Sequence, residues 1–319
     1  MEEKNFTELK EFILLCFTAD LQLQRILFLV FLIIYVFCLL GNITMIFLVC
    51  SDSQLHTPMY FFIGSLSLLD LWYSSVFAPK ILMICISEDK SISFAGCLAQ
   101  FFFTGGLGFS ECYLLAAMAY DCYVAIANPL LYFQAMSPRL CASLVAASYF
   151  GGFLNSAIIT SKTFTLSFCG NNVINGFFCD LPPLVKLACD VKESYQAMLY
   201  FTLASNVITP SLLILVSYLF IIAAILNIFS IQGHLKSFST CGSHLTAVTL
   251  YSGSVPFIYS RPISSYALKW DKVVSVFYTV VIPMLNPLIY SLRNKDVKEA
   301  LRKTLDRVKL SQLKILGKQ

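Results

Sequence analysis

The chain has 319 residues, of which 58% are hydrophobic and only 13% are charged. A soluble domain with so few charged residues would lack the surface needed to stay dissolved, so the composition indicates a polytopic membrane protein. The formal net charge is +4, but the basic residues form no patch interleaved with aromatic residues, so nucleic-acid binding is not predicted.

Residues 1–24 form a short polar segment before the first apolar run. It contains Asn5-Phe6-Thr7, an acceptor pattern for N-glycosylation, and we expect a glycan at Asn5 if this segment is lumenal. A chance match is the alternative, since three-residue patterns are common. The first apolar run is too long for a cleavable signal peptide and is interpreted as an uncleaved signal-anchor helix.

Seven apolar segments follow in the sequence, and we interpret them as transmembrane helices: 26–50, 59–86, 97–126, 140–160, 197–229, 238–260 and 272–292. The predicted fold class is therefore an all-α membrane protein, a seven-transmembrane helix bundle spanning residues 25–292. Prolines at 210, 256, 283 and 287 fall inside these segments and predict kinks supported by neighbouring helices.

The third segment is the most informative, because Cys97, Glu111 and Asp121 lie near its start, middle and end. As a helix it covers roughly 36 Å between Cys97 and Asp121, slightly more than the hydrocarbon core of a bilayer. Glu111 is then left near mid-membrane, where an acid must face protein rather than lipid.

The orientation follows from the tail, residues 293–319, which carries nine Lys/Arg against three acids. By the positive-inside rule the C-terminus is cytoplasmic, and seven spans then place the N-terminus outside. Residues 293–310 alternate apolar and charged positions at helical spacing. They predict a short amphipathic helix in contact with lipid at the cytoplasmic membrane face.

The longest connection, about 161–196, falls on the outer side and contains Cys169, Cys179 and Cys189. With Cys97 it gives four lumenal cysteines, for which disulfides are expected in an oxidising compartment. Four cysteines allow three pairings, and the sequence does not choose among them. Tethering this loop to the third helix would fold it over the mouth of the bundle; free thiols are the alternative.

Several short motifs stand at fixed places along these spans. They are Gly41-Asn42, LHTPMY at 55–60, MAYDCYVAIANPL at 118–130, SFSTCGSHL at 237–245 and PMLNPLIYSLRN at 283–294. With these motifs the chain resembles a class A G-protein-coupled receptor of the olfactory (odorant) receptor family. The resemblance implies a multi-pass plasma-membrane receptor that binds a small volatile ligand. It also implies activation of a stimulatory olfactory-type heterotrimeric G protein, which raises cyclic AMP.

The resemblance also assigns a ligand site in the outer half of the bundle. On the third helix Thr104 and Gly108 share a face with Glu111, and Gly105, Phe109 and Cys112 line the adjacent stripe. By resemblance the pocket is completed by Thr202, Asn206, Tyr259, Ser275 and Thr279. Helix packing is the alternative role for each of these residues. No pocket position carries a fixed charge apart from the deeper Glu111, so a mostly apolar ligand is expected.

Asp70, Glu111 and Asn286 form a second constellation, because each lies mid-span in a different helix. In the family the matching positions look like a pocket for an allosteric sodium ion that holds the inactive state. The alternative is that both acids hold protons and are only hydrogen-bonded. No other cofactor or metal is expected.

The switch motifs include one clear departure from the family pattern. Asp121-Cys122-Tyr123 stands where the family has Asp-Arg-Tyr, while Asn286, Pro287 and Tyr290 match the family's seventh-helix motif. Cys122 has no guanidinium group with which to pair with Asp121 or reach the G protein. Either shifted basal signalling or weak coupling is expected. Ser252 is a second departure, because an aromatic residue usually precedes the glycine there.

A coupled receptor has two alternatives. The first keeps the fold but couples weakly or not at all, because Cys122 replaces the family arginine. The second is a transporter or channel, which predicts internal repeats and paired charges along a path; the sequence has neither. Enzyme signatures are absent, since His56, His234 and His244 lack metal-ligand spacing and no nucleophile–base set is present.

Overall fold

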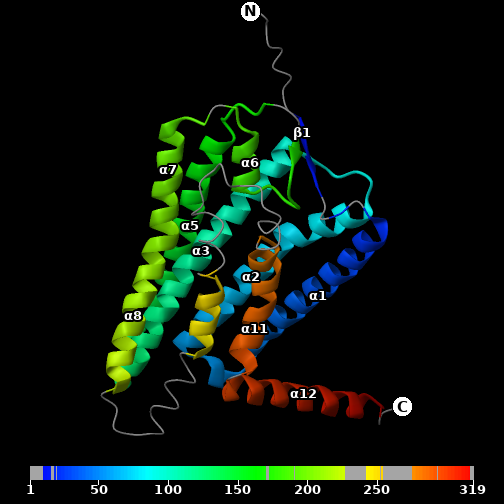
Figure 1. The fold of residues 1–319 in the computed structure, drawn as a ribbon. Coiled ribbons are helices and arrows are strands. Elements are labelled where there is room, and N and C mark those ends of the chain that lie inside the picture. Colours follow the sequence, from blue (N-terminus) through cyan, green and yellow to red (C-terminus); the bar gives the residue numbers. More distant parts are fainter. Residues whose placement is uncertain are drawn as a thin grey trace, which may run out of the picture.

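The computed structural model describes residues 10–15, 18, 20–169, 172–189, 191–226, 242–251, 253, 275–292 and 294–316. The predictions for Asn5, Ser252 and Tyr259 fall outside these residues. Long helices run side by side as a bundle, with a small sheet at one end and a helix lying across the other (Figure 1).

Five helices in the described part of the chain are long and apolar enough to cross a membrane. They are α1 (Leu21–Ser51), α2 (Pro58–Ile86), α3 (Phe94–Ala127), α5 (Pro138–Thr163) and a fifth that runs from Glu193 to Leu226. Residues 242–251 are helical within the sixth predicted span. The seventh contains η4 (Phe277–Val281) and α11 (Ile282–Leu292).

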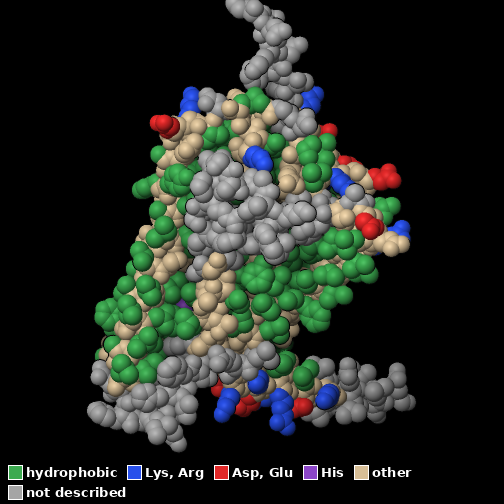
Figure 2. Space-filling view, in the orientation of Figure 1, with side chains coloured by type: hydrophobic (Ala, Val, Ile, Leu, Met, Phe, Trp, Pro, Cys, Tyr) green, Lys and Arg blue, Asp and Glu red, His purple; other side chains and the backbone are tan. Residues whose placement is uncertain are grey.

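The helices begin where their sequences provide caps. Asp20 accepts a hydrogen bond of 2.8 Å from the backbone N–H of Gln22, so α1 starts earlier than its apolar run. Ser93 caps α3 through the N–H of Gly96, and Ser137 caps α5 through that of Leu140. Figure 2 shows hydrophobic side chains along the sides of the bundle and charged ones at its two ends, as a membrane-spanning protein requires.

Two π-helical turns interrupt the fifth and seventh spans, and each precedes a proline. The fifth span consists of α7 (Glu193–Leu203), the π segment η2 (Ala204–Ile208) and α8 (Thr209–Leu226). Pro210 stands just after η2, and Pro283 stands just after the π segment η4. A proline removes one N–H and clashes with the preceding turn, so the wider π turn relieves the conflict without ending the helix.

Helix α3 lies at the centre of the bundle and packs against α2, α5 and α8. Its contact with α5 depends on two glycines. A Cβ on Gly106 would stand 2.6 Å from the ring of Phe153, and one on Gly152 would stand 2.3 Å from the hydroxyl of Ser110. Close approach of the two backbones therefore requires glycine at both positions.

A three-stranded sheet covers the outer end, in the order β2-β1-β3. Strand β1 (Glu11–Leu14) pairs antiparallel with β2 (Ser91–Ser93) and parallel with β3 (Val173–Ile174). Phe12 and Leu14 are fully buried, and the Phe12 ring packs against those of Phe94 and Phe168. The prediction of a merely polar segment before the first helix therefore misses a strand that packs into an apolar core.

The cytoplasmic end carries three further elements: η1 (Ser53–Leu55), α4 (Tyr132–Ala135) and α12 (Lys295–Leu316). Helix α12 crosses the end of the bundle (Figure 1), and basic side chains gather along it (Figure 2). The hydroxyl of Tyr60 donates to Asn294 at 2.9 Å and to Asp296 at 3.0 Å, while Val297 is buried in the main core. These contacts fix the start of the predicted amphipathic helix against the bundle.

Candidate ligand chamber and cytoplasmic switch

A cavity lies in the outer half of the bundle, between α2, α3, α5, the fifth span, the 242–251 helix and η4, beneath the loop that carries Asp180. Its volume is about 60 Å³, measured as the space that the centre of a water molecule can reach. One water needs about 10–15 Å³ by this measure, so the cavity holds a compact small molecule. Its walls are mostly apolar, and include Phe101, Phe109, Ile159, Leu181, Leu203 and Val207.

The residues that the sequence places on the third helix stand at this wall. They are Thr104, Gly105, Gly108, Phe109 and Cys112. The structure does not bring Thr202, Asn206, Ser275 or Thr279 to the cavity wall. The side chain of Asn206 instead accepts a hydrogen bond from the hydroxyl of Tyr113 at 2.6 Å and donates to the carbonyl of Thr202 at 2.7 Å. The ligand contacts themselves remain predictions.

Five polar residues at the wall were not foreseen: Tyr73, Ser156, Asp180, Tyr251 and Tyr278. A signal for two of them exists in the sequence. Tyr73 lies three residues after Asp70, and therefore on the same face of α2. Asp180 follows Cys179 directly, so any bond that brings that cysteine to α3 also brings the acid to the mouth of the bundle.

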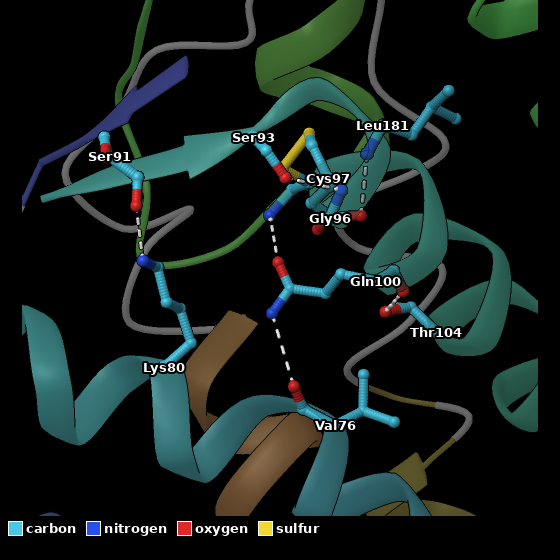
Figure 3. Close-up of a disulfide and its surroundings, with 11 residues drawn as sticks. Val76, Lys80, Ser91, Ser93, Gly96, Cys97, Gln100, Thr104 and Leu181 are labelled. Atoms are coloured by element: carbon cyan, nitrogen blue, oxygen red, sulfur yellow. Dashed lines mark hydrogen bonds between the residues drawn. A yellow bond between two sulfur atoms is a disulfide. The ribbon is translucent and has the colours of Figure 1, made fainter. Parts of the chain in front are cut away.

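Two disulfides, Cys97–Cys179 and Cys169–Cys189, select one of the three possible pairings. The first ties the outer loop to the start of α3, as Figure 3 shows. Gln100 supports it, because its side-chain oxygen accepts from the N–H of Cys179 at 2.9 Å while its amide donates to the carbonyl of Val76. The loop is therefore held over the chamber by a covalent bond and a bridging amide.

Asp180 brings a carboxylate to the roof of the chamber. One oxygen accepts from the N–H of Leu181 at 2.8 Å, and the other accepts from the hydroxyl of Tyr278 at 2.8 Å. This corrects the expectation that Glu111 alone brings charge to the pocket, because Asp180 lines the cavity and is almost fully buried. The disulfide and the helix cap of α6 (Leu181–Leu187) together position it.

Below the chamber, Asp70, Glu111 and Asn286 are all buried. The side-chain amide of Asn286 donates to Asp70 at 2.9 Å. One oxygen of Asp70, the amide oxygen of Asn286 and that of Asn42 are buried without a hydrogen-bond partner among the described residues. A small hard cation prefers oxygen ligands, and these oxygens receive no hydrogen bond from the described residues. They are therefore of the kind that would fit the predicted sodium ion.

At the cytoplasmic end, Tyr132 of α4 donates a hydrogen bond of 2.9 Å to the buried carboxylate of Asp121. Burial and the adjacent carboxylate raise the pKa of Tyr132 well above its ordinary value, so the hydroxyl keeps its proton. Cys122 is buried beside Asp121, and the ring of Tyr123 packs on Phe220. Asp121 thus has a partner from the cytoplasmic loop although the family arginine is missing.

A second contact joins three helices close to this end. His244, on the 242–251 helix, lies 2.8 Å from the hydroxyl of Tyr218 through Nδ1 and 3.1 Å from the carbonyl of Leu115 through Nε2. A carbonyl only accepts, so Nε2 carries a proton, and in the neutral ring Nδ1 accepts from Tyr218. His244 therefore ties its helix to both α8 and α3.

The seventh-helix motif is packed into the bundle. A Cβ on Gly41 of α1 would stand 3.2 Å from the ring of Pro287, so this contact favours glycine. Tyr290 is buried, and its hydroxyl has no hydrogen-bond partner among the described residues. The structure thus brings Asn286 to Asp70, Pro287 to α1, and Tyr290 into the core near the cytoplasmic switch.

Comparisons with known proteins agree with this geometry. A family profile described as olfactory receptor matches residues 31–307. Olfactory receptor 9G19 of Mus musculus and olfactory receptor 9G9 of Homo sapiens are each 66% identical over 305 residues, which cover 96% of this chain and 100% of each relative. Among solved structures, squid rhodopsin matches with a TM-score of 0.74 at 17% identity, over 91% of this chain and 87% of that one. The predicted all-α seven-helix fold is confirmed.

Proposed function

We propose that this chain, which belongs to the olfactory receptor family, binds a small and mostly apolar odorant in its chamber and activates a stimulatory olfactory-type heterotrimeric G protein, raising cyclic AMP. Membership of the family makes it an odorant receptor rather than an enzyme, and a multi-pass protein of the plasma membrane. The G protein, the second messenger and the nature of the ligand are the proposed part.

The chamber is the observation that carries the proposal. It is small and mostly apolar, with a few polar side chains, and it lies beneath a loop held by the Cys97–Cys179 disulfide. These are the properties of a pre-formed site for a small organic ligand. Phe109 and Val207 supply apolar contact, while the hydroxyl of Tyr73 and the carboxylate of Asp180 supply polar groups at the wall.

A route for transmission runs along the 242–251 helix. At its outer end Tyr251 lines the chamber and donates a hydrogen bond of 2.7 Å to the carbonyl of Gly108. Two turns away, His244 bonds to Tyr218 and Leu115. A ligand that displaces Tyr251 therefore acts on a rigid helix whose other end bonds to α8 and α3. The ligand then favours the arrangement of these helices to which it binds more tightly.

The cytoplasmic face offers an apolar surface for the G protein next to the switch. Leu130 is 98% exposed, and Leu131 and Phe133 are also exposed, on the short loop that holds Tyr132. Apolar side chains clustered on a water-facing loop favour a protein partner. Because Tyr132 bonds to Asp121, docking on this loop would act directly on the switch.

We further propose that sodium binds at Asp70 and Glu111, beside Asn286, and that α12 contacts anionic lipid. Helix α12 carries exposed Lys298, Arg302 and Arg307. Basic residues beside a cytoplasmic membrane surface are attracted by its anionic lipids. Asn5 remains the expected glycan site.

A cyclic AMP assay tests the function, with surface-labelled cells that express the native chain or its Cys122→Arg variant. A response of the native chain to a panel of volatile odorants would support coupling without the arginine. A response of the Cys122→Arg variant alone would favour the second candidate, a receptor of the same fold in which Cys122 disconnects binding from coupling. Silence of both variants at normal surface density would contradict the proposed signalling function.

A further inference from the structure

One hydroxyl in the chamber makes no hydrogen bond within the described part of the protein. Tyr73 of α2 lines the cavity and is only 2% exposed. Its ring packs edge-on against Phe77. Its hydroxyl forms no hydrogen bond with any residue that the structure describes. A buried phenol that lacks a partner is costly unless something else satisfies it.

The other hydroxyls of the described cavity wall are already engaged. Those of Thr104, Ser156 and Tyr251 donate to the backbone carbonyls of Gln100, Phe102 and Gly108, at 2.6, 2.6 and 2.7 Å, and that of Tyr278 donates to Asp180. Each therefore stabilises a helix or the roof. Tyr73 differs from these four because its hydrogen stays available to a molecule inside the chamber.

The space next to this hydroxyl is kept open by a glycine. A Cβ on Gly108 would stand 3.8 Å from the oxygen of Tyr73 and 3.6 Å from the oxygen of Tyr251. Both are ordinary van der Waals distances, so alanine would fit there. Glycine at position 108 is therefore not needed to avoid a clash. The absence of a side chain there leaves room for a ligand atom beside the hydroxyl of Tyr73.

The charge around the site restricts which ligand can fill it. Glu111, Asp180 and Asp70 all lie within electrostatic reach of Tyr73. No lysine, arginine or histidine is among the described residues that line the cavity. An anionic ligand would gain no counter-charge and would face acidic groups on more than one side, so carboxylates are disfavoured.

We propose that Tyr73 is the specificity-determining anchor of the chamber, donating a hydrogen bond to the carbonyl oxygen of a neutral ketone, aldehyde or ester. The inference rests on the proposed odorant-binding function and names the class of ligand. A carbonyl compound suits this site because it accepts a hydrogen bond and brings no donor of its own.

Thermal unfolding of the purified full-length receptor in lipid nanodiscs tests this without relying on G-protein coupling. The probes are a linear methyl ketone, hydrocarbon and carboxylic acid of equal chain length, each titrated over several chain lengths. A ligand that binds the folded state raises the unfolding temperature by an amount that grows with the logarithm of its concentration divided by its dissociation constant. The wild type should bind the ketone about tenfold more tightly than the hydrocarbon, and the acid no better than the hydrocarbon.

The Tyr73→Phe variant keeps the ring and removes only the hydroxyl. It should lose the roughly tenfold preference for the ketone and bind the hydrocarbon as the wild type does. Tyr200→Phe, at an exposed tyrosine of α7, is the matched control and should change neither affinity. Unchanged ketone affinity in Tyr73→Phe would overturn the proposal, as would wild-type binding of the acid as tight as that of the ketone.

Gly108→Ala provides a second test that does not depend on the folding of the first variant. It places a methyl group beside the hydroxyl at ordinary contact distance, so it should fold and bind the ketone more weakly. If the wild type binds all probe classes equally, odorant binding stands and this inference falls. If no probe stabilises the wild type, the proposed function and the inference fall together.

Discussion

The hydroxyl of Tyr132 donates to the carboxylate of Asp121 across 2.9 Å, and so takes a place that the family gives to arginine. This bond joins the loop that presents Leu130 to the end of α3. In this chain, where Cys122 stands beside Asp121, the hydroxyl of Tyr132 holds the switch carboxylate. Asp121 is therefore restrained by a tyrosine of the loop that we propose as the docking surface for the G protein.

We expect Tyr132→Phe to weaken this restraint. It leaves a buried carboxylate oxygen without its donor, which costs about 1–3 kcal/mol and lowers the unfolding temperature by roughly 2–6 °C. Basal cyclic AMP per surface receptor should rise, because the resting state loses more than an opened one. Tyr120→Phe, at an exposed position of α3 next to Asp121, should change neither quantity. Unaltered basal signalling and stability in Tyr132→Phe would show that Asp121 is held by other groups.

His244 gives a second prediction at the same end of the bundle. Replacing it with phenylalanine keeps an aromatic ring but removes both of its hydrogen bonds, to Tyr218 and to the carbonyl of Leu115. The 242–251 helix should then separate from α3 more easily, so basal cyclic AMP should rise in the native and Cys122→Arg backgrounds. His56→Phe, at an exposed histidine, is the matched control. A fall in basal signalling would mean that His244 supports the active state instead.

The sequence predicts the spans well because a helix needs about twenty mostly apolar residues to cross the bilayer, and hydropathy measures that directly. It also predicts the α3 wall, where Thr104 and Gly108 share a face at regular helical spacing. The positions proposed on the fifth and seventh spans do not line the cavity. Asn206 and Thr279 lie inside the π segments η2 and η4, whose wider turns rotate side chains away from α-helical positions. Such turns leave no signature in hydropathy.

Other features depend on contacts between distant parts of the chain. Strand β1 has four residues and is stable only because β2 and β3 pair with it. Asp180 reaches the chamber only after Cys179 pairs with Cys97, a choice that three equally allowed pairings leave open. Tyr73 lies on the face of α2 that carries Asp70, but its unpaired hydroxyl becomes visible only when the rest of the wall is in place.

The two disulfides should differ in how much they stabilise the receptor. Cys97–Cys179 closes 82 residues of chain and Cys169–Cys189 closes 20. The loss of unfolded-state entropy corresponds to about 4.5 kcal/mol for the longer loop and about 3 kcal/mol for the shorter. Cys97→Ser also releases the roof, including Asp180, so it should reduce ligand binding as well as surface density. Cys169→Ser should reduce surface density less; the opposite order would contradict this account.

The sodium hypothesis makes a prediction that separates it from two protonated acids. Buried oxygens of Asp70 and Asn286 have no hydrogen-bond donor among the described residues, and a cation bound at Asp70 would bring a positive charge to this buried group. Sodium should then raise the unfolding temperature of the purified receptor relative to choline at equal ionic strength. The gain should be about 1.4 kcal/mol when sodium is tenfold above its dissociation constant.

Asp70→Asn tests this directly, because it keeps the size of the side chain and the hydrogen-bonding partner of Asn286 but removes the charge that binds a cation. The variant should lose the sodium effect. Asp89→Asn, at an exposed acid whose pKa hydrogen bonds from Ser91 keep low, should retain it in full. If sodium and choline act alike on the native chain, both acids hold protons, and their burial is maintained by hydrogen bonds alone. If sodium still stabilises Asp70→Asn, the cation binds elsewhere in the receptor.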